Sequence, residues 1–320
     1  MAALVYLLYG NKPSYQNELS YSVLTAVSHA QKSGGAVDIL LFCDEASARH
    51  DLPVENIVLS PEKLEDWSLG GSYFHLIKIH VVREALRRFR IPICFVDTDT
   101  EFLAAPSLLF ERMGETSSLM HSKDGVLAEM PLWSGLLDHS ADPVVGGALS
   151  PDAAMLNSGL IGVHPTQAMA LDQALELARA LYSIAPVFNI EQFALGACLQ
   201  AQGPVHFGAD VVAHYWGYER FNYHEKIPGV LAGLPKDLRQ VDVSSFSGIE
   251  PAEKPLSAKL RARFWASAKG WSDDQRFAYL AYLCSQRART SSDRRVWSQV
   301  HAEALSGLSD GGASLGLPDP

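Results

Sequence analysis

Short runs of consecutive apolar residues alternate, over the first third of the chain, with stretches in which apolar residues recur at helical spacing. A continuous apolar run is typical of a strand covered on both faces, and a helical recurrence predicts a helix. The predicted elements are, in order, strand Ala3–Leu8, a helix containing Leu19, Val23, Val27 and Ala30, strand Val37–Cys43, strand Asn56–Leu59, helix Tyr73–Arg90 and strand Ile91–Val96. This alternation predicts an α/β fold, with a mostly parallel central sheet and helices on both faces.

The pattern is looser beyond residue 110. It predicts a loop at Ser140–Asp152, a strand at Met155–Val163 interrupted by Asn157-Ser158-Gly159, helices at Thr166–Tyr182 and Ile190–Gln202, and a short strand at Val211–Ala213. Met169 is expected on the inward face of the first of these helices. We expect one large domain over residues 1–250, a more basic helical C-terminal extension over 251–305, and a disordered tail rich in Gly, Ser and Pro over 306–320.

Polar residues directly follow three of the predicted strands: Gly10, Asp44, and the pair Asp97 and Asp99. Open α/β sheets bind ligands at the carboxyl ends of their strands, so these residues are expected at one rim. Side chains alternate along a strand, so Asp97 and Asp99 point the same way. Two like charges held together require a metal, a basic partner or solvent. Carboxylate oxygens suit a hard divalent cation, while a solvated turn or a helix cap is the structural alternative.

Composition narrows the classes of partner. The net charge of -10 and the pI near 5.5 disfavour nucleic acid, which needs a basic face, but leave a nucleotide open. The four cysteines are widely spaced, which predicts free thiols in a reducing compartment. No apolar stretch is long enough to form a transmembrane segment, which favours a cytoplasmic protein. The basic aromatic segment 259–265 either packs on the main domain or lies on a membrane surface or an acidic partner, so a membrane-peripheral position stays open.

Several other residues are candidates for a binding role. Lys78 shares a helical stripe with Phe74 and Val81, which are expected to face inward, so it either reaches the cleft or covers apolar surface with its stem. Asn157 lies in a Gly-containing strand break, which indicates either a backbone close to a ligand or a plain turn. Glu191 begins a helix, where the helix dipole favours a carboxylate, so a structural role stays open for it.

Four segments occur in an order that is similar to a known family: Phe95-Val96-Asp97-Thr98-Asp99, Asn157-Ser158-Gly159, Glu191-Gln192, and His214-Tyr215-Trp216-Gly217. This order resembles the GT-A glycosyltransferases, nearest to the glycogenin-like branch, over roughly residues 3–225. The resemblance implies a GT-A type fold and a Mn²⁺ or Mg²⁺ ion. In the family's pattern, Asp97, Asp99 and His214 are the residues that match the metal ligands.

The resemblance also implies roles for other residues. The first strand ends at Leu8-Tyr9-Gly10, with Tyr15 shortly after, where such enzymes bind the nucleotide base. Thr98 and Gly217 are expected to bind the nucleotide-sugar, and Lys78 or Arg220 is expected to add positive charge at its diphosphate. The resemblance implies that Asn157, Glu191 and Gln192 face the donor sugar. The implied partners are a nucleotide-diphosphate sugar, with a UDP-sugar favoured, and an acceptor that is a glycan, a lipid-linked molecule or a protein. Retention of configuration is favoured by the late histidine.

Two departures from the family pattern leave the exact branch and the donor sugar open. His75-Leu76-Ile77-Lys78 stands where related branches often have an Arg-Lys pair, and Tyr218-Glu219-Arg220 follows where Lys-Pro is frequent. Two other functions are weighed against transfer. A binding protein with a decayed site is disfavoured by the intact motifs. A hydrolase or nucleotidyltransferase would use the same aspartates, but the segment Gly10-Asn11-Lys12-Pro13 is not the Gly-rich basic loop usual in nucleotidyltransferases.

Overall fold

The computed structural model describes residues 2–243, 246 and 248–310. The chain forms two units. The first comprises Met1–His214 and Pro235–Phe246, and the second comprises Tyr215–Leu234 and Ser247–Pro320. Segment Tyr215–Leu234 therefore groups with the C-terminal helices, whereas the sequence predicted one domain through residue 250.

A mixed seven-stranded sheet forms the centre of the first unit, in the order β10-β6-β9-β4-β1-β2-β3. Its strands are β1 (Ala3–Leu8), β2 (Asp38–Cys43), β3 (Glu55–Val58), β4 (Ile93–Val96), β6 (Ser118–Met120), β9 (Leu160–Val163) and β10 (Val205–Phe207). The sequence predicted the four parallel strands β1 to β4. The side chains of β1, β2 and β4 are largely buried, whereas β3 lies at the edge of the sheet and buries only Ile57. Only β9 runs antiparallel to its neighbours in this sheet, so the prediction of a mostly parallel sheet is confirmed.

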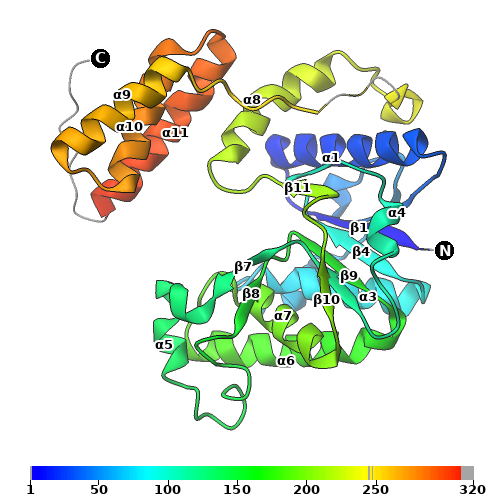
Figure 1. Cartoon of the computed structure of the whole chain (residues 1–320). Coiled ribbons are helices and arrows are strands. Elements are labelled where there is room, and N and C mark those ends of the chain that lie inside the picture. Colours follow the sequence, from blue (N-terminus) through cyan, green and yellow to red (C-terminus); the bar gives the residue numbers. More distant parts are fainter. Residues whose placement is uncertain (1, 244–245, 247, 311–320) are drawn as a thin grey trace. The chain divides into compact units, whose positions relative to one another are not determined.

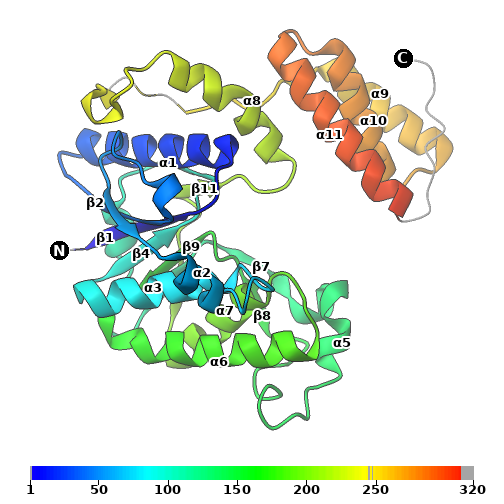
Figure 2. The ribbon, with the colours of Figure 1, turned by 180° about the vertical axis from the view of Figure 1, so that it is seen from behind.

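Helices cover both faces of this sheet, as predicted. Figures 1 and 2 show α1 on one side and α3, α6 and α7 on the other. The helices of the first unit are α1 (Pro13–Lys32), α2 (Pro61–Trp67), α3 (Leu76–Phe89), α4 (Ser107–Phe110), α5 (Ser134–Leu137), α6 (Ala168–Ile184) and α7 (Ile190–Gln202). Short 3-10 helices lie at Glu45–Ser47, Leu127–Glu129, Pro131–Trp133, Pro165–Gln167 and Leu238–Gln240. The sequence analysis did not predict α2.

Two side chains expected to face inward are exposed. Phe74 is 51% exposed because α3 begins only at Leu76, which leaves Phe74 in the preceding turn, where its ring stacks on Tyr9. Met169 is 64% exposed in the first turn of α6. The other predicted inward positions of these helices are buried, and they pack in the core between the sheet and α3, α6 and α7.

Two small antiparallel pairs extend the first unit. Strand β5 (Thr100–Phe102) pairs with β11 (Val212–His214), and β7 (Lys123–Val126) pairs with β8 (Ala154–Leu156). The predicted strand Met155–Val163 is thus two strands in two different sheets, β8 and β9. The break predicted at residues 157–159 is the point at which the chain passes from one sheet to the other.

The second unit is helical. It contains α8 (Glu219–Ala232), α9 (Leu256–Lys269), α10 (Asp273–Arg287) and α11 (Ser291–Asp310). A capping box of Ser272 and Gln275 begins α10, whose apolar face packs on α9 and α11. Residues 306–310, predicted as part of a disordered tail, belong to α11, while 311–320 lie outside the described residues. None of the helices searched among the described residues is both long and apolar enough to cross a membrane.

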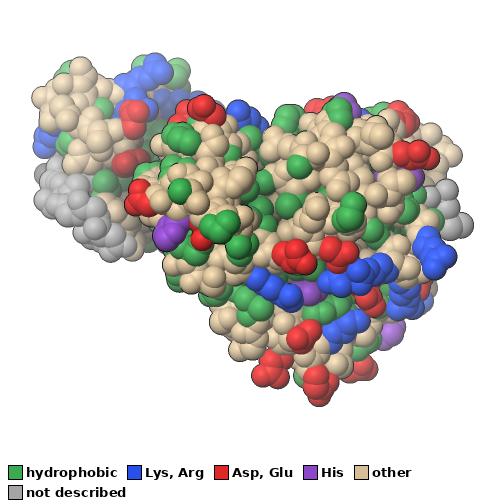
Figure 3. All heavy atoms as spheres, turned by 90° about the horizontal axis from the view of Figure 1, so that it is seen from below, with side chains coloured by type: hydrophobic (Ala, Val, Ile, Leu, Met, Phe, Trp, Pro, Cys, Tyr) green, Lys and Arg blue, Asp and Glu red, His purple; other side chains and the backbone are tan. Residues whose placement is uncertain are grey.

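The cysteines are free thiols, as predicted: Cys43, Cys94 and Cys284 are buried, and Cys198 is half-buried. Burial raises the pKa of each thiol, which keeps it protonated and unreactive. On the face displayed in Figure 3, acidic and basic side chains lie next to one another. Surface ion pairs in the first unit include those of Arg83 and Arg87 with Asp172, at 2.8 and 3.1 Å.

Candidate metal centre

Backbone pairing brings two distant segments, β9 and β11, to the end of β4. Strand β9 pairs with β4 such that the Asp97 N–H donates to the Gly159 carbonyl oxygen at 2.9 Å. Strand β5 follows the two aspartates directly, and its pairing with β11 sets His214 opposite Thr100. His214 therefore reaches the aspartates through the register of a short antiparallel ladder.

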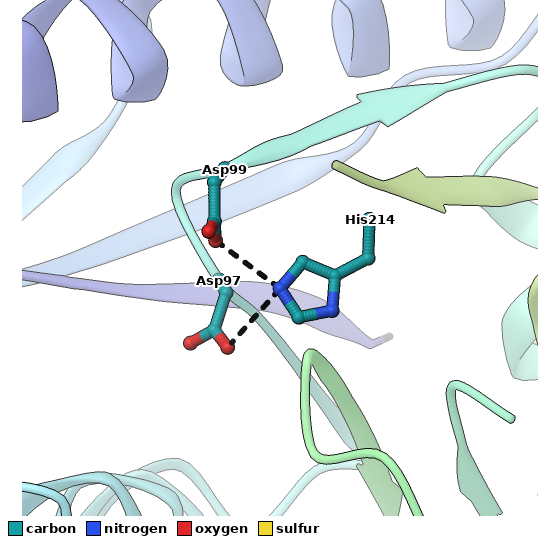
Figure 4. A group of neighbouring side chains, drawn as sticks. All are labelled: Asp97, Asp99 and His214. Atoms are coloured by element: carbon teal, nitrogen blue, oxygen red, sulfur yellow. Dashed lines mark ion pairs between the residues drawn. The ribbon is translucent and has the colours of Figure 1, made fainter. Parts of the chain in front are cut away.

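The side chains of Asp97, Asp99 and His214 converge (Figure 4). His214 Nε2 lies 3.3 Å from Asp99 Oδ1 and 3.9 Å from Asp97 Oδ2. One ligand atom from each residue lies within 4.8 Å of the others, which is a spacing that one metal ion can bridge. The site is largely shielded, since these side chains are 23%, 12% and 9% exposed, respectively.

A hydrogen bond decides which imidazole nitrogen faces the aspartates. Asn157 Oδ1 accepts from the Gly159 N–H at 2.9 Å and lies 3.0 Å from His214 Nδ1. Because this oxygen is an acceptor, His214 Nδ1 is the donor, and the neutral ring presents the lone pair of Nε2 to both carboxylates. Because Nε2 and the carboxylate oxygens are all acceptors, a cation or a proton must lie between Nε2 and the two carboxylates. Two carboxylates and one imidazole nitrogen suit Mn²⁺ or Mg²⁺, so the residues present fit the implied metal.

The His214 ring needs a glycine beneath it. A Cβ atom at Gly159 would lie 2.1 Å from His214 Nδ1, which is far inside van der Waals contact. The ring also packs against His121 in an edge-to-face arrangement, with ring centroids 5.5 Å apart. His121 is itself held by a hydrogen bond of 2.9 Å between its Nε2 and the Val212 carbonyl oxygen. The glycine of the Asn-Ser-Gly segment thus serves close packing of the imidazole.

Lys78 reaches the site from α3. Its ammonium donates to Asp97 Oδ2 at 2.8 Å and to the carbonyl and hydroxyl oxygens of Ser158 at 3.2 and 3.1 Å. Burial by itself lowers the pKa of Lys78, but the carboxylates of Asp97 and Glu191 outweigh this effect and raise the pKa above its ordinary value. Lys78 is therefore a fixed positive charge beside Asp97.

Glu191 lies behind this lysine and is only 3% exposed. Its Oε1 accepts from the Ser158 hydroxyl at 3.2 Å, and its Oε2 accepts from the Tyr73 hydroxyl at 2.9 Å. The Glu191 N–H donates in turn to the Tyr73 oxygen at 2.9 Å. Both carboxylate oxygens thus have internal partners, and the chain Tyr73–Glu191–Ser158–Lys78 ends at Asp97.

A second set of polar groups forms the rim around Asn157. Gln192 accepts from the Ser158 N–H at 3.2 Å and donates to Asp124 Oδ2 at 3.1 Å. Asn157 Nδ2 also donates to Asp124 Oδ2, at 3.2 Å. Asp124 is exposed, and its sequence context carries no signal that could have identified it.

A buried chain of hydroxyl groups supports the aspartate loop from below. Thr100 Oγ1 donates to the Asp97 carbonyl oxygen at 2.8 Å, so it must accept from Ser22 Oγ at 2.7 Å. Ser22 in turn accepts from the Tyr6 hydroxyl at 2.9 Å. The sequence analysis missed this chain. Its signal is a set of polar residues on the buried face of α1, namely Ser20, Ser22, Thr25 and Ser28.

Four further residues predicted to bind the nucleotide lie at or just after the end of β1: Leu8, Tyr9, Gly10 and Tyr15. The Leu8 side chain is buried in the core, and the Gly10 N–H donates to Asp44 Oδ2 at 2.8 Å, which confirms that these two strand ends share a rim. Burial raises the pKa of Tyr9, and the nearby Tyr15 and Asp97 raise it further. Tyr9 and Tyr15 are half-buried, so each keeps an accessible part of its ring.

The remaining predicted residues are Thr98, Gly217 and Arg220. The Thr98 hydroxyl donates to Glu18 Oε2 on α1 at 3.5 Å. Gly217 and Arg220 belong to the second unit, where Arg220 Nε donates to His224 Nε2 at 3.3 Å. Their predicted contact with a nucleotide-sugar stays a prediction.

Comparison with known proteins gives a likeness of fold alone. No known protein family matches the sequence, and no curated protein matches it. The structure is similar to mouse xyloside xylosyltransferase 1 in its apo form, with 11% identity over 63% of this chain and 82% of that chain and a TM-score of 0.43. It is also similar to the apo WbbM bifunctional glycosyltransferase, with 12% identity over 74% of this chain and 50% of that chain and a TM-score of 0.48. Neither likeness assigns a reaction to this chain.

Proposed function

We propose that this chain is a metal-dependent GT-A glycosyltransferase of the glycogenin-like branch, which moves a sugar from a nucleotide-diphosphate sugar to an acceptor. The observation that carries the proposal is the convergence of Asp97, Asp99 and the lone pair of His214 Nε2 at the end of β4. When bound there, Mn²⁺ or Mg²⁺ supplies Lewis-acid stabilisation of the diphosphate leaving group.

Lys78 orients Asp97 and adds a positive charge next to the leaving group. Its ammonium is held by three oxygens, so it does not need to reorganise as negative charge grows on the diphosphate. Glu191 keeps this lysine protonated and holds Ser158 in place, which makes Glu191 a positioning residue.

The environment of Glu191 bears on the stereochemical outcome. An inverting transfer needs a carboxylate that accepts the acceptor's proton. Glu191 is buried and both its oxygens accept internal hydrogen bonds, which argues against that role. Retention needs no such base, and we propose a retaining transfer.

We assign recognition of the donor to two groups of residues, one for the sugar and one for the base. Asn157, Gln192 and Asp124 present polar groups to the hydroxyls of the donor sugar, while Tyr9 and Tyr15 offer aromatic rings to the base. We favour UDP as the nucleotide. The acceptor is not assigned.

The first test is a thermal-shift screen with UDP, GDP, CDP and ADP, each with and without Mn²⁺. A ligand that binds only the native state raises the melting temperature. Stabilisation by one nucleotide only in the presence of Mn²⁺ supports the proposal and identifies the base. If none of the four gives a metal-dependent shift, the proposal is wrong.

The second test asks whether activity depends on the two aspartates of the metal centre in particular or on the loss of any exposed carboxylate. Asp97→Ala and Asp99→Ala are expected to abolish Mn²⁺-dependent UDP-sugar hydrolysis and transfer while the circular dichroism spectrum stays unchanged. Asp138→Ala, an exposed aspartate, is the matched control and should keep full activity. Full activity in either site variant would contradict the metal role.

A further inference from the structure

Helix α9 buries two alanines and exposes three large apolar residues, while Trp265 packs against the second unit. Ala258 and Ala262 are buried against the helices of the second unit. Leu256, Leu260 and Phe264 are 70%, 58% and 66% exposed. These three recur at every fourth position and therefore form one continuous stripe along the helix. An exposed apolar stripe of this kind on a surface helix indicates a binding partner outside the described chain.

Positive charge borders this apolar stripe. Helix α9 contains four basic residues and no acidic one, although the whole chain has 36 acidic and 26 basic residues. Lys259 and Arg263 are exposed and lie one turn apart, on the same side of the helix as the apolar stripe. The partner of this face therefore combines apolar matter with negative charge.

We propose that α9 lies on an anionic lipid bilayer, with Leu256, Leu260 and Phe264 in the headgroup–acyl boundary and Lys259 and Arg263 on the anionic headgroups. An exposed apolar face with Lys and Arg at its edge is the pattern of helices that lie in the membrane interface, and each basic residue near an anionic surface adds attraction. A second copy of this chain, docked through the same face, would bring like charges together.

The test is co-sedimentation of the full chain with vesicles of phosphatidylglycerol and phosphatidylcholine, compared with vesicles of phosphatidylcholine alone. We expect binding to the anionic vesicles that weakens at least tenfold between low salt and 0.5 M salt. Leu260→Glu/Phe264→Glu and, separately, Lys259→Glu/Arg263→Glu should each lose at least tenfold in vesicle affinity. Met169→Glu, which changes an equally exposed apolar residue of the first unit, should bind like the wild type.

Each other result overturns the proposal. The proposal is wrong if the full chain does not bind anionic vesicles, if it binds neutral vesicles equally well, or if either double variant binds like the wild type. A change of molar mass of the Leu260→Glu/Phe264→Glu variant in size-exclusion light scattering would assign the stripe to a second copy instead. All substituted side chains are exposed, so the melting temperature should stay near that of the wild type. The assay needs no nucleotide or acceptor, so its outcome is independent of the proposed transferase activity.

Discussion

His214 Nδ1 and Asn157 Oδ1 lie 3.0 Å apart, and this one hydrogen bond fixes which nitrogen of the imidazole faces the two aspartates. The Asn157 oxygen also accepts from the Gly159 N–H, so it cannot be the donor. Asn157 thus orients the His214 imidazole, and residues that orient a metal ligand in this way commonly tune metal affinity.

Removing this orienting oxygen should weaken metal binding without unfolding the protein. We expect Asn157→Ala to lower Mn²⁺ affinity by about 10- to 100-fold, because the His214 ring is then free to rotate or to change tautomer. Isothermal titration of Mn²⁺ into the purified protein measures this directly. Affinity within a factor of about two of the wild type, with an unchanged circular dichroism spectrum, would mean that Asn157 does not set the tautomer.

A methyl group at Gly159 should act on the same ring by steric exclusion. Because the added Cβ would lie 2.1 Å from His214 Nδ1, Gly159→Ala must displace the imidazole, with loss of Mn²⁺ binding and a destabilisation of roughly 1–3 kcal/mol. Gly147→Ala is the matched control, since a Cβ there meets no atom within 4 Å. Mn²⁺ titration and urea unfolding of both variants make the comparison. Equal behaviour of the two would contradict the packing argument.

The sequence alone predicted the parallel half of the sheet and the aspartate pair for a physical reason. The side chains of β1, β2 and β4 are largely buried on both faces, so these strands appear in the sequence as apolar runs, and the first polar residues after them are expected at the edge of the sheet. Asp97 and Asp99 follow from that rule alone. His214 does not, because its position depends on the register of β11 against β5, which no local pattern encodes.

Other parts of the site were outside the reach of sequence patterns. The chain from Tyr6 through Ser22 to Thr100 joins three elements through side-chain hydroxyls. Because Ser and Thr are mostly exposed in proteins, their presence in the sequence does not indicate a buried network. Phe74 was assigned to the core because helical spacing was extended two residues beyond the start of α3. Helix starts are the least certain part of a periodicity argument, since capping rather than apolar spacing sets them.

The buried hydroxyl chain should support the metal centre through the backbone of Asp97. Thr100→Val keeps the shape of the side chain but removes the donor to the Asp97 carbonyl and the acceptor for Ser22, which we expect to cost about 1–3 kcal/mol of unfolding free energy. Mn²⁺ affinity should fall as well, because the aspartate loop loses its support. Urea unfolding and Mn²⁺ titration report the two effects. Thr116→Val, at an exposed position, is the control and should change neither quantity.

A different buried group should govern the response of the fold to acid. His80 on α3 is only 6% exposed, stacks on Trp67 with ring centroids 5.0 Å apart, and has Arg179 Nη2 3.4 Å from its Nε2. Burial, followed by the charges of Arg179 and Arg83, lowers the pKa of His80 from 6.5 to about 3. In the unfolded chain His80 therefore binds a proton below pH 6.5, whereas in the folded chain it does so only near pH 3.

The stability contributed by neutral His80 is present above pH 6.5 and is lost progressively as the pH falls toward 3. Within that window the free energy of unfolding should fall by up to about 1.4 kcal/mol per pH unit from this residue. Urea unfolding of the wild type and of His80→Gln between pH 7.5 and 4.5 isolates the effect, because the variant lacks only this titration. We expect a shallower pH dependence for His80→Gln. Parallel curves for wild type and His80→Gln would contradict the prediction, because they would show that His80 takes up its proton at the same pH in the folded and unfolded chains.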